Sequence, residues 1–237
     1  MAIIQNHLFK LLPSQDRKRL LDACETVTLT SSDVLCEPGQ KLRHAYFPID
    51  SYISLLTVVD DHAGVEVGMV GREGMLGASL AQGVLTVPLK ALVQGDGAAL
   101  RIPAAALRAQ LAQSPALQRV MHRYLYVLMA QMATSAACLR YHQIGPRLAR
   151  WLLMSEDRAH SKHLDMTQEF LAAMLGVRRV GVTQAASELH RAGLISYRRG
   201  ALTVLDRAGL KAAACSCYAM DQKTYAATLG PSRKPMT

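Results

Sequence analysis

The chain has 237 residues, of which 50% are hydrophobic and 19% charged, and its formal net charge at pH 7 is +9. This length accommodates two modest domains or one large one, and the apolar content is sufficient for a packed core. No apolar run approaches the roughly 20 residues that a membrane-spanning helix requires. The N-terminal residues lack the pattern of a signal peptide, so we expect a cytoplasmic protein.

The positive charge is concentrated in the C-terminal part of the chain. Residues 1–139 contain 12 Lys and Arg against 11 Asp and Glu, whereas residues 140–237 contain 15 against 7. A basic region of this kind raises the affinity for a polyanion such as nucleic acid and makes binding sensitive to salt. A solvated basic surface without a partner is the alternative, so the charge needs support from a motif.

The N-terminal part predicts two kinds of structure. Residues 1–25 have the apolar spacing of one or two short helices, whereas residues 26–103 form short apolar segments separated by turn signals such as Pro38-Gly39. Many short strands at regular spacing are typical of a β-sandwich or jelly roll. Some jelly rolls are metal enzymes, but this segment has only two histidines, far apart, so we predict no metal and no catalytic site in it.

A short helix over residues 103–113 is expected to precede a long one. Ser114 is a suitable N-cap and Pro115 a suitable first residue for a helix that reaches about His142. A stripe at alternating spacings of four and three is typical of a two-stranded coiled coil, although packing within the same domain buries such a stripe too. We predict a dimer interface made by Leu117, Met121, Tyr124, Leu128, Gln131, Ser135 and Cys138.

Gly145-Pro146 predicts a hinge, followed by a helix over residues 147–156. Beyond it, Thr167 can N-cap a helix that ends at Gly176, a residue suited to a sharp turn because it tolerates positive φ. A second helix is expected from about Arg178 to Arg191. The positions at which two crossing helices need small or apolar side chains are suitably filled. A helix-turn-helix is the prediction, and a two-helix corner of some other globular protein is the alternative.

The second helix of this motif carries polar side chains on its outward face. Arginine and glutamine can make bidentate contacts to guanine and adenine edges in the major groove. Residues 194–205 alternate around Gly200 and predict a hairpin whose basic tip suits phosphate contacts. For base-edge or groove contacts we predict Arg179, Thr183, Gln184 and Ser187, and for contacts nearer the backbone Arg178, Arg191, Arg198 and Arg199, with Thr167 also in the interface. Such a motif normally reads two half-sites as a dimer, which favours the dimeric assignment of the long helix.

Three segments together resemble the Crp/Fnr family of bacterial transcription regulators. They are MTQEFLAAMLGVRRVGVTQAASELHRAGLISYRRG, VGREGMLG at residues 70–77 and the segment LKAAACSCY. The resemblance implies an α+β fold: an N-terminal jelly-roll (double-stranded β-helix, cyclic-nucleotide-binding-like) sensor domain, a long dimerisation helix and a C-terminal winged helix-turn-helix. We place these parts at residues 1–113, 114–145 and 146–237, and expect a helix from Asp206 to about Tyr218 to close the last domain.

The chain departs from the better-known members at positions that matter for ligand and operator. Ala78 stands where cyclic-nucleotide binders of the family have a glutamate, and Val87-Pro88 stands where they have an Arg-Ser pair. A buried cyclic phosphate would then lack a cation, which disfavours cyclic AMP. Val180 and Gln184 stand where familiar members have a glutamate and an arginine in the recognition helix. The half-site sequence that those members bind therefore cannot be assumed for this chain. The residues proposed to line an effector pocket are Gly71, Arg72, Glu73, Met75 and Gly77, and a pair that stabilises the turn is the alternative for Arg72 and Glu73.

The five cysteines have no C-x-x-C spacing, and Cys24 and Cys36 do not reproduce the cysteine cluster of the family's iron–sulfur members. The Cys215-x-Cys217 pair is compatible with a redox or metal site and with structural packing; we predict packing and no cofactor.

The sequence thus predicts a homodimeric, sequence-specific transcription regulator without catalytic activity. The partners expected are palindromic double-stranded DNA, a second copy of the chain, RNA polymerase and an unidentified small-molecule effector. A redox- or haem-sensing regulator of the same fold is one alternative. A jelly-roll metal enzyme with a nucleic-acid-binding module is the alternative from another class.

Overall fold

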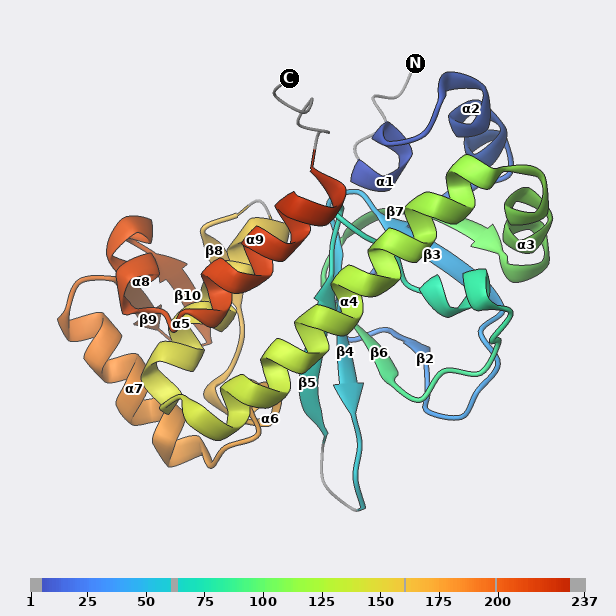
Figure 1. Ribbon diagram of the computed structural model, residues 1–237. Helices are drawn as coiled ribbons and strands as arrows, with labels where there is room; N and C mark the ends of the chain where they lie inside the picture. The colour runs from blue at the N-terminus through green and yellow to red at the C-terminus, as the bar shows by residue number, and fades with distance from the viewer. Residues whose placement is uncertain (1–5, 61–63, 160, 199, 231–237) are drawn as a thin grey trace, which may run out of the picture.

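The computed structural model describes residues 6–60, 64–159, 161–198 and 200–230, which form an N-terminal β domain and a C-terminal helical domain joined by a long helix (Figure 1). The N-terminal domain begins with two short helices, as expected, and continues into strands. Its elements are α1 (His7–Lys10), α2 (Ser14–Asp22), β1 (Glu25–Leu29), β2 (Val34–Cys36), β3 (His44–Pro48), β4 (Tyr52–Thr57), β5 (Val65–Val70), the 3₁₀ helix η1 (Ala78–Gln82), β6 (Lys90–Gly95), β7 (Gly97–Pro103) and α3 (Ala104–Gln113).

The strands form two antiparallel sheets, with strand orders β1-β7-β3 and β2-β6-β4-β5. The predicted strands are present, and the three-residue β2, which no alternation signals, is added at the edge of the second sheet. Their apolar faces enclose a core that includes Phe9 and Phe47, whose rings meet edge to face at 4.9 Å. The β-sandwich architecture expected from the turn spacing is confirmed.

The long helix α4 (Pro115–Tyr141) begins as predicted. The Ser114 hydroxyl accepts a hydrogen bond from the backbone N–H of Leu117 at 3.0 Å, and Pro115 occupies the first turn. The break that follows lies at residues 142–143, not at Gly145-Pro146, because proline is tolerated in the first turn of a helix. Helix α5 (Ile144–Ala159) therefore includes both residues. None of the helices in the described residues combines the length and the apolar character needed to cross a membrane.

The C-terminal domain is built around α5. Its other elements are β8 (His163–Asp165), α6 (Gln168–Leu175), α7 (Arg179–Arg191), β9 (Ile195–Arg198), β10 (Ala201–Val204), α8 (Arg207–Ala213) and α9 (Cys217–Leu229). The predicted hairpin is present as β9 and β10, and β8 pairs with β10 to extend it. The single helix expected from Asp206 to about Tyr218 is wrong, because the chain leaves helical geometry at residues 214–216 and then starts α9.

Helix α9 lies beside α4 and contacts both domains (Figure 1). In the N-terminal domain, the Tyr225 hydroxyl donates to the carbonyl of Glu73 at 2.9 Å and lies 2.8 Å from the His7 ring. In the C-terminal domain, Asp221 forms an ion pair with Arg150 at 2.7 Å. One helix at the end of the fold therefore adds its own contacts to both domains.

Candidate nucleic-acid interface

The helix-turn-helix is formed by α6 and α7. The Thr167 hydroxyl accepts a hydrogen bond from the backbone N–H of Phe170 at 3.1 Å, which satisfies one of the unpaired donors at the start of α6. Gly176 ends the helix with a left-handed φ of 60°. The two helices then cross over small and apolar residues that are buried: Leu171, Ala172, Leu175, Val182 and Ala185. The predicted motif is confirmed at these positions.

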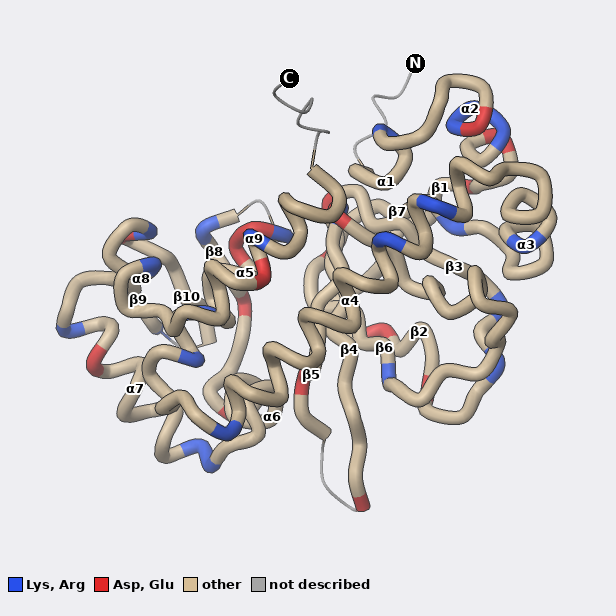
Figure 2. Tube along the Cα trace, viewed as in Figure 1, with Lys and Arg blue, Asp and Glu red and all other residues tan. Residues whose placement is uncertain are grey.

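The opposite face of α7 is exposed. Arg178, Arg179, Thr183, Gln184 and Ser187 are all solvent-accessible, and the backbone tube of Figure 2 shows basic residues at the turn between α6 and α7. The two hydroxyls are held in place within the motif, because Thr183 donates to Gln168 Oε1 at 2.7 Å and Ser187 to the carbonyl of Thr183 at 2.8 Å. The arginine and glutamine side chains reach into solvent from this supported surface, with that of Arg179 67% exposed.

The remaining predicted contact residues flank this face. Arg191 is exposed in the last turn of α7, and Arg198 is exposed at the end of β9 beside the hairpin turn. Arg199, predicted at the tip of the hairpin, lies outside the described residues. Thr167 remains exposed while it caps α6, so its position suits both roles.

Gly181 in the first turn of α7 has a structural reason that the sequence did not reveal. A Cβ atom at this position would lie 2.6 Å from Cδ1 of Ile144, the first residue of α5. Glycine therefore permits α5 and α7 to approach closely beneath the exposed face, in spite of its cost of about 1 kcal/mol in a helix. Gly181 therefore contributes to the placement of α7 against α5.

The comparisons with known proteins identify this architecture. The Crp-like helix-turn-helix domain family matches residues 146–213. A Crp/Fnr-family transcriptional regulator from Thermus thermophilus is 24% identical, with a TM-score of 0.66 over 80% of this chain and 98% of its own. The chain has the fold of a Crp/Fnr transcription regulator.

Two further Crp/Fnr structures support the same fold. A regulator from Eubacterium rectale has a TM-score of 0.68 at 16% identity and covers 86% of this chain and 96% of its own. The c-di-GMP-responsive regulator CLP from Xanthomonas campestris has a TM-score of 0.66 at 17% identity, with coverage of 82% and 100%. The comparison with curated proteins gives no match. The fold class and the family resemblance expected from the sequence are thus confirmed.

In this Crp/Fnr fold, two of the five predicted effector residues line a cavity. Arg72 and Glu73 border a space of about 320 Å³ between the turn after β5 and helices α4, α5 and α9. Gly71 is buried next to them. Met75 and Gly77 are buried as well, but they do not line this cavity, because Met75 packs into the N-terminal core and Gly77 caps η1 with a φ of 98°.

The Glu73 carboxylate also forms a contact between the two domains that sequence patterns do not signal. It lies 2.7 Å from the Arg158 guanidinium of α5, whose side chain is 10% exposed, and it accepts a hydrogen bond from the backbone N–H of Gly71. The turn-stabilising role expected for this residue is thus present, together with a partner 85 positions along the chain. Arg158 was not identified from the sequence because no local motif marks it.

The prediction of the dimer seam is wrong for five of its seven residues, which do not lie on an exposed face. Leu117, Met121, Tyr124, Ser135 and Cys138 are buried within their own chain. The first three pack into the N-terminal core, Ser135 accepts from Arg150, and Cys138 packs against Cys215. The other two predicted seam residues, Leu128 and Gln131, line the interdomain cavity. This stripe of α4 is apolar because it faces its own β domain and α9.

Burial at the domain junction predicts a pH-dependent stability. Burial raises the pKa of Glu66 to about 7, although the Ser54 hydroxyl and the guanidinium groups of Arg150 and Arg158 oppose the shift. The folded state then holds the proton more tightly than the unfolded state does, so Glu66 lowers stability as the pH rises from its ordinary pKa of 4.5 to about 7. At about pH 8, Glu66→Gln should have a free energy of unfolding higher than that of the unsubstituted protein by on the order of 2 kcal/mol, and it should therefore unfold at a higher urea concentration. This difference should shrink towards about pH 5.

The control for this prediction is Glu169→Gln, in which the carboxylate replaced is 78% exposed. Urea denaturation of both variants across the pH range distinguishes the cases. A stability difference for Glu66→Gln that does not grow with pH would show that the carboxyl titrates normally.

Proposed function

We propose that the chain is a sequence-specific, DNA-binding transcription regulator that acts as a homodimer and has no catalytic activity. The observation that carries this proposal is the exposed outer face of α7, where Arg179 and Gln184 project from a Crp-like helix-turn-helix. Both side chains can read base edges in the major groove, and the hairpin of β9 and β10 brings Arg198 to the neighbouring backbone. Val180, 68% exposed on the same helix, supplies an apolar surface suited to a thymine methyl group.

The homodimer is supported by a second apolar stripe on α4, one residue further along than the predicted one. Its members repeat at alternating spacings of four and three and are exposed or half-buried: Leu125, Met129, Met132, Ala136 and Leu139. Met129 is 65% exposed, and together with its neighbours it forms an apolar stripe, not a single exposed side chain. A twofold partner on this face would bury the stripe and present two copies of α7 to two half-sites.

An effector other than cyclic AMP is supported by the apolar side chains at Ala78, which is buried, and at Val87. We place the effector in the cavity bordered by Arg72 and Glu73, where charged groups and the interdomain ion pair meet. RNA polymerase is the partner through which a DNA-bound regulator of this fold would act.

Selection from random duplex DNA tests the proposed function. The purified full chain is incubated with the pool at near-physiological salt and with excess non-specific competitor, because phosphate contacts alone give salt-sensitive binding to any sequence. Enrichment of a palindrome with half-sites about one helical turn apart supports a dimeric regulator. Recovery of unenriched sequence, both without ligand and with a cell extract of small molecules added, would contradict sequence-specific reading.

Arg179→Ala tests the assignment of the reading face. Loss of a bidentate base contact should remove roughly 1–3 kcal/mol of discrimination at one base pair of the selected site. Arg198→Ala is the comparison variant, and we expect it to weaken binding to all sequences to the same degree, because a phosphate contact carries no sequence information. Quantitative gel-shift assays against single-base variants of the site measure both. Uniform weakening by Arg179→Ala would reassign that side chain to the backbone.

A further inference from the structure

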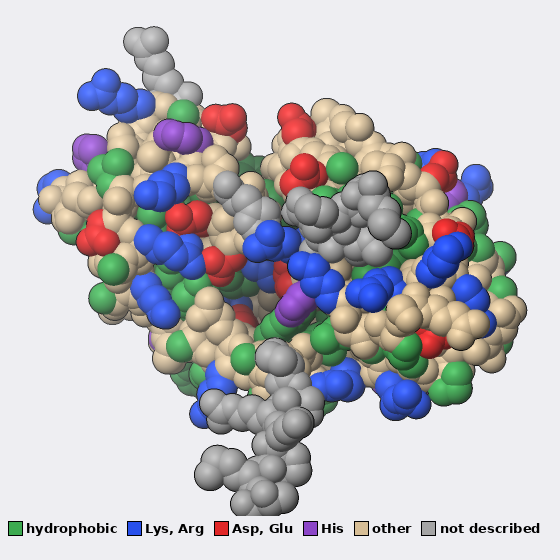
Figure 3. Space-filling model, turned by 90° about the horizontal axis from the view of Figure 1, so that it is seen from above, with side chains coloured by type: hydrophobic (Ala, Val, Ile, Leu, Met, Phe, Trp, Pro, Cys, Tyr) green, Lys and Arg blue, Asp and Glu red, His purple; other side chains and the backbone are tan. Residues whose placement is uncertain are grey.

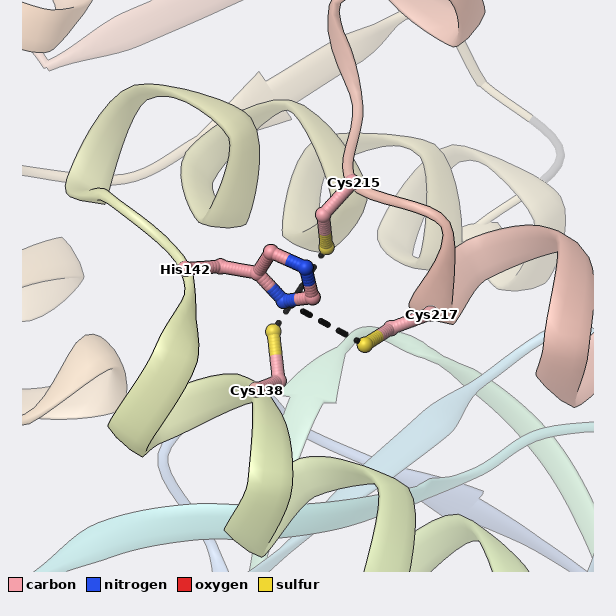
Figure 4. A group of neighbouring side chains, drawn as sticks. All are labelled: Cys138, His142, Cys215 and Cys217. Carbon is pink, nitrogen blue, oxygen red and sulfur yellow. Dashed lines mark hydrogen bonds between the residues drawn. The ribbon is translucent and has the colours of Figure 1, made fainter.

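Four side chains with metal-binding atoms converge where α4 ends and α9 begins. Cys138 and His142 are one helical turn apart at the end of α4, and Cys215 and Cys217 flank the start of α9 (Figure 4). The three sulfur atoms and one ring nitrogen all lie within 4.8 Å of one another. Two separate segments, more than 70 positions apart in the chain, thus supply two donors each.

The spacing of these donors suits a single tetrahedral ion. Sγ of Cys138 lies 3.5 Å from Sγ of Cys215, and Sγ of Cys217 lies 3.5 Å from Nδ1 of His142. Zinc–sulfur bonds of about 2.3 Å in a tetrahedron place neighbouring sulfurs about 3.8 Å apart, so small adjustments of the side chains would close the site. An iron–sulfur cluster has several irons and holds its ligands further apart, so the compactness favours one ion.

The chemistry of the donors selects the same ion. Three thiolates and one imidazole are soft and borderline ligands, which suit zinc rather than calcium or magnesium. The cysteines are 2%, 8% and 3% exposed, so water has little access to the centre. The guanidinium groups of Arg147 and of Arg150, the latter also paired with Asp221, are close enough to Cys138 and Cys215 to interact with their charge, and they would reduce the excess negative charge of three thiolates around a divalent ion.

We propose that Cys138, His142, Cys215 and Cys217 bind one Zn²⁺ ion. Four protein ligands leave no open coordination position, which is typical of a structural rather than a catalytic zinc site. The ion would link the start of α9 to the end of α4, next to the non-helical residues 142–143 that separate α4 from α5. The segment before α9 already meets the start of α5 in a hydrogen bond of 3.3 Å, which the backbone N–H of Cys215 donates to the carbonyl of Pro146. The ion would thereby fix the direction in which the helix-turn-helix domain leaves α4.

Metal content and cobalt spectroscopy test the proposal on the full chain. Protein purified without chelator, or stripped and reloaded with zinc and then desalted, should retain one zinc ion per chain by elemental analysis. Cobalt(II) loaded into the stripped protein should give thiolate-to-cobalt charge transfer and the intense d–d bands of tetrahedral coordination. Adding zinc should abolish both, because zinc binds thiolate sites more tightly.

Matched cysteine variants locate the ion. Cys215→Ser/Cys217→Ser should bind zinc about a hundredfold more weakly or worse, since two of four ligands lose their thiolate character. Cys24→Ser/Cys36→Ser carries the same number of substitutions away from the cluster and should retain one ion. If the double variant does not fold, His142→Gln replaces it in the zinc-binding measurement, because His142 is half-buried at the edge of the cluster. It should also bind zinc more weakly than the unsubstituted chain.

Three results would overturn the proposal. One is that the zinc-loaded full chain keeps no stoichiometric ion after desalting. Another is that His142→Gln or the Cys215→Ser/Cys217→Ser variant, shown to be folded by circular dichroism, binds zinc as tightly as the unsubstituted chain. The third is a coloured, iron-containing protein whose colour depends on these cysteines, which would assign the cluster to iron–sulfur chemistry instead.

Discussion

Replacing Gly74 with alanine should lower the free energy of unfolding by about 3 kcal/mol, the upper end of the usual range for forcing atoms into a filled core. Gly74 lies in the turn after β5, and the ring of Tyr124 on α4 covers it so closely that an added Cβ would overlap the phenol group. Tyr124 is 3% exposed and packs in the N-terminal core, so moving the ring aside would disrupt that packing. On the other side, the Gly74 carbonyl accepts from the Asn6 side chain at 2.9 Å, which holds the turn against the ring.

Urea denaturation measures this effect, and two variants define its cause. Gly145→Ala is the matched control, because a Cβ at Gly145 meets nothing within 4 Å and alanine favours a helix more than glycine does. In the Tyr124→Leu background, Gly74→Ala should lose most of its effect, since the overlapping hydroxyl and ring edge are gone; the coupling energy from this double-mutant cycle isolates the clash. Equal destabilisation with and without the tyrosine would mean that backbone conformation, not the ring, requires glycine.

Met129→Glu should raise the dissociation constant of the homodimer by about a hundredfold or more. Met129 is 65% exposed on the second apolar stripe of α4, and in a dimer packed on that stripe the substitution would place two carboxylates across the twofold axis without partners. Because the residue is exposed in the single chain, the substitution should leave monomer stability nearly unchanged. Sedimentation velocity over a range of protein concentrations gives the dissociation constant, and urea denaturation the stability.

Met220→Glu introduces the same change at a methionine that is 53% exposed on α9, off this stripe, and should leave the sedimentation mass unchanged. A Met129→Glu protein that sediments as the unsubstituted dimer would exclude this face of α4 as the interface. Loss of the dimer should also lower affinity for a palindrome far more than for a single half-site, because only the dimer joins two reading helices.

The sequence predicted the elements whose signals are local. Ser114, Thr167 and Gly176 cap helices through contacts with residues only a few positions away. The local sequence is therefore enough to predict these helix ends. The register of α4 could not be read in this way. Its residues are apolar on two adjacent stripes, and periodicity alone does not tell which stripe faces the β domain and which stays exposed on the single chain.

The parts that the sequence missed depend on contacts between distant segments. Helix α9 has tyrosines and alanines without a clear apolar stripe, and it is held by individual partners such as Arg150 and His7. Of the proposed metal ligands, the sequence pattern indicated only Cys215 and Cys217. The other two, Cys138 and His142, come from the end of α4, more than 70 positions earlier in the chain. The sequence places the excess of positive charge in the C-terminal part of the chain, but the surface is less uniform. On the face shown in Figure 3, Lys and Arg are spread over both domains and interspersed with acidic residues.

The contacts of α9 also have a consequence for synthesis of the protein. His7 and Tyr225 interact across 218 positions of sequence, and Asp221 reaches Arg150 across 71. On the ribosome, the β domain and the helix-turn-helix would emerge and collapse separately, since domains fold largely as units during translation. Residues 217–229 are released last, so the contacts that this helix makes with both domains would be added after the two domains have formed.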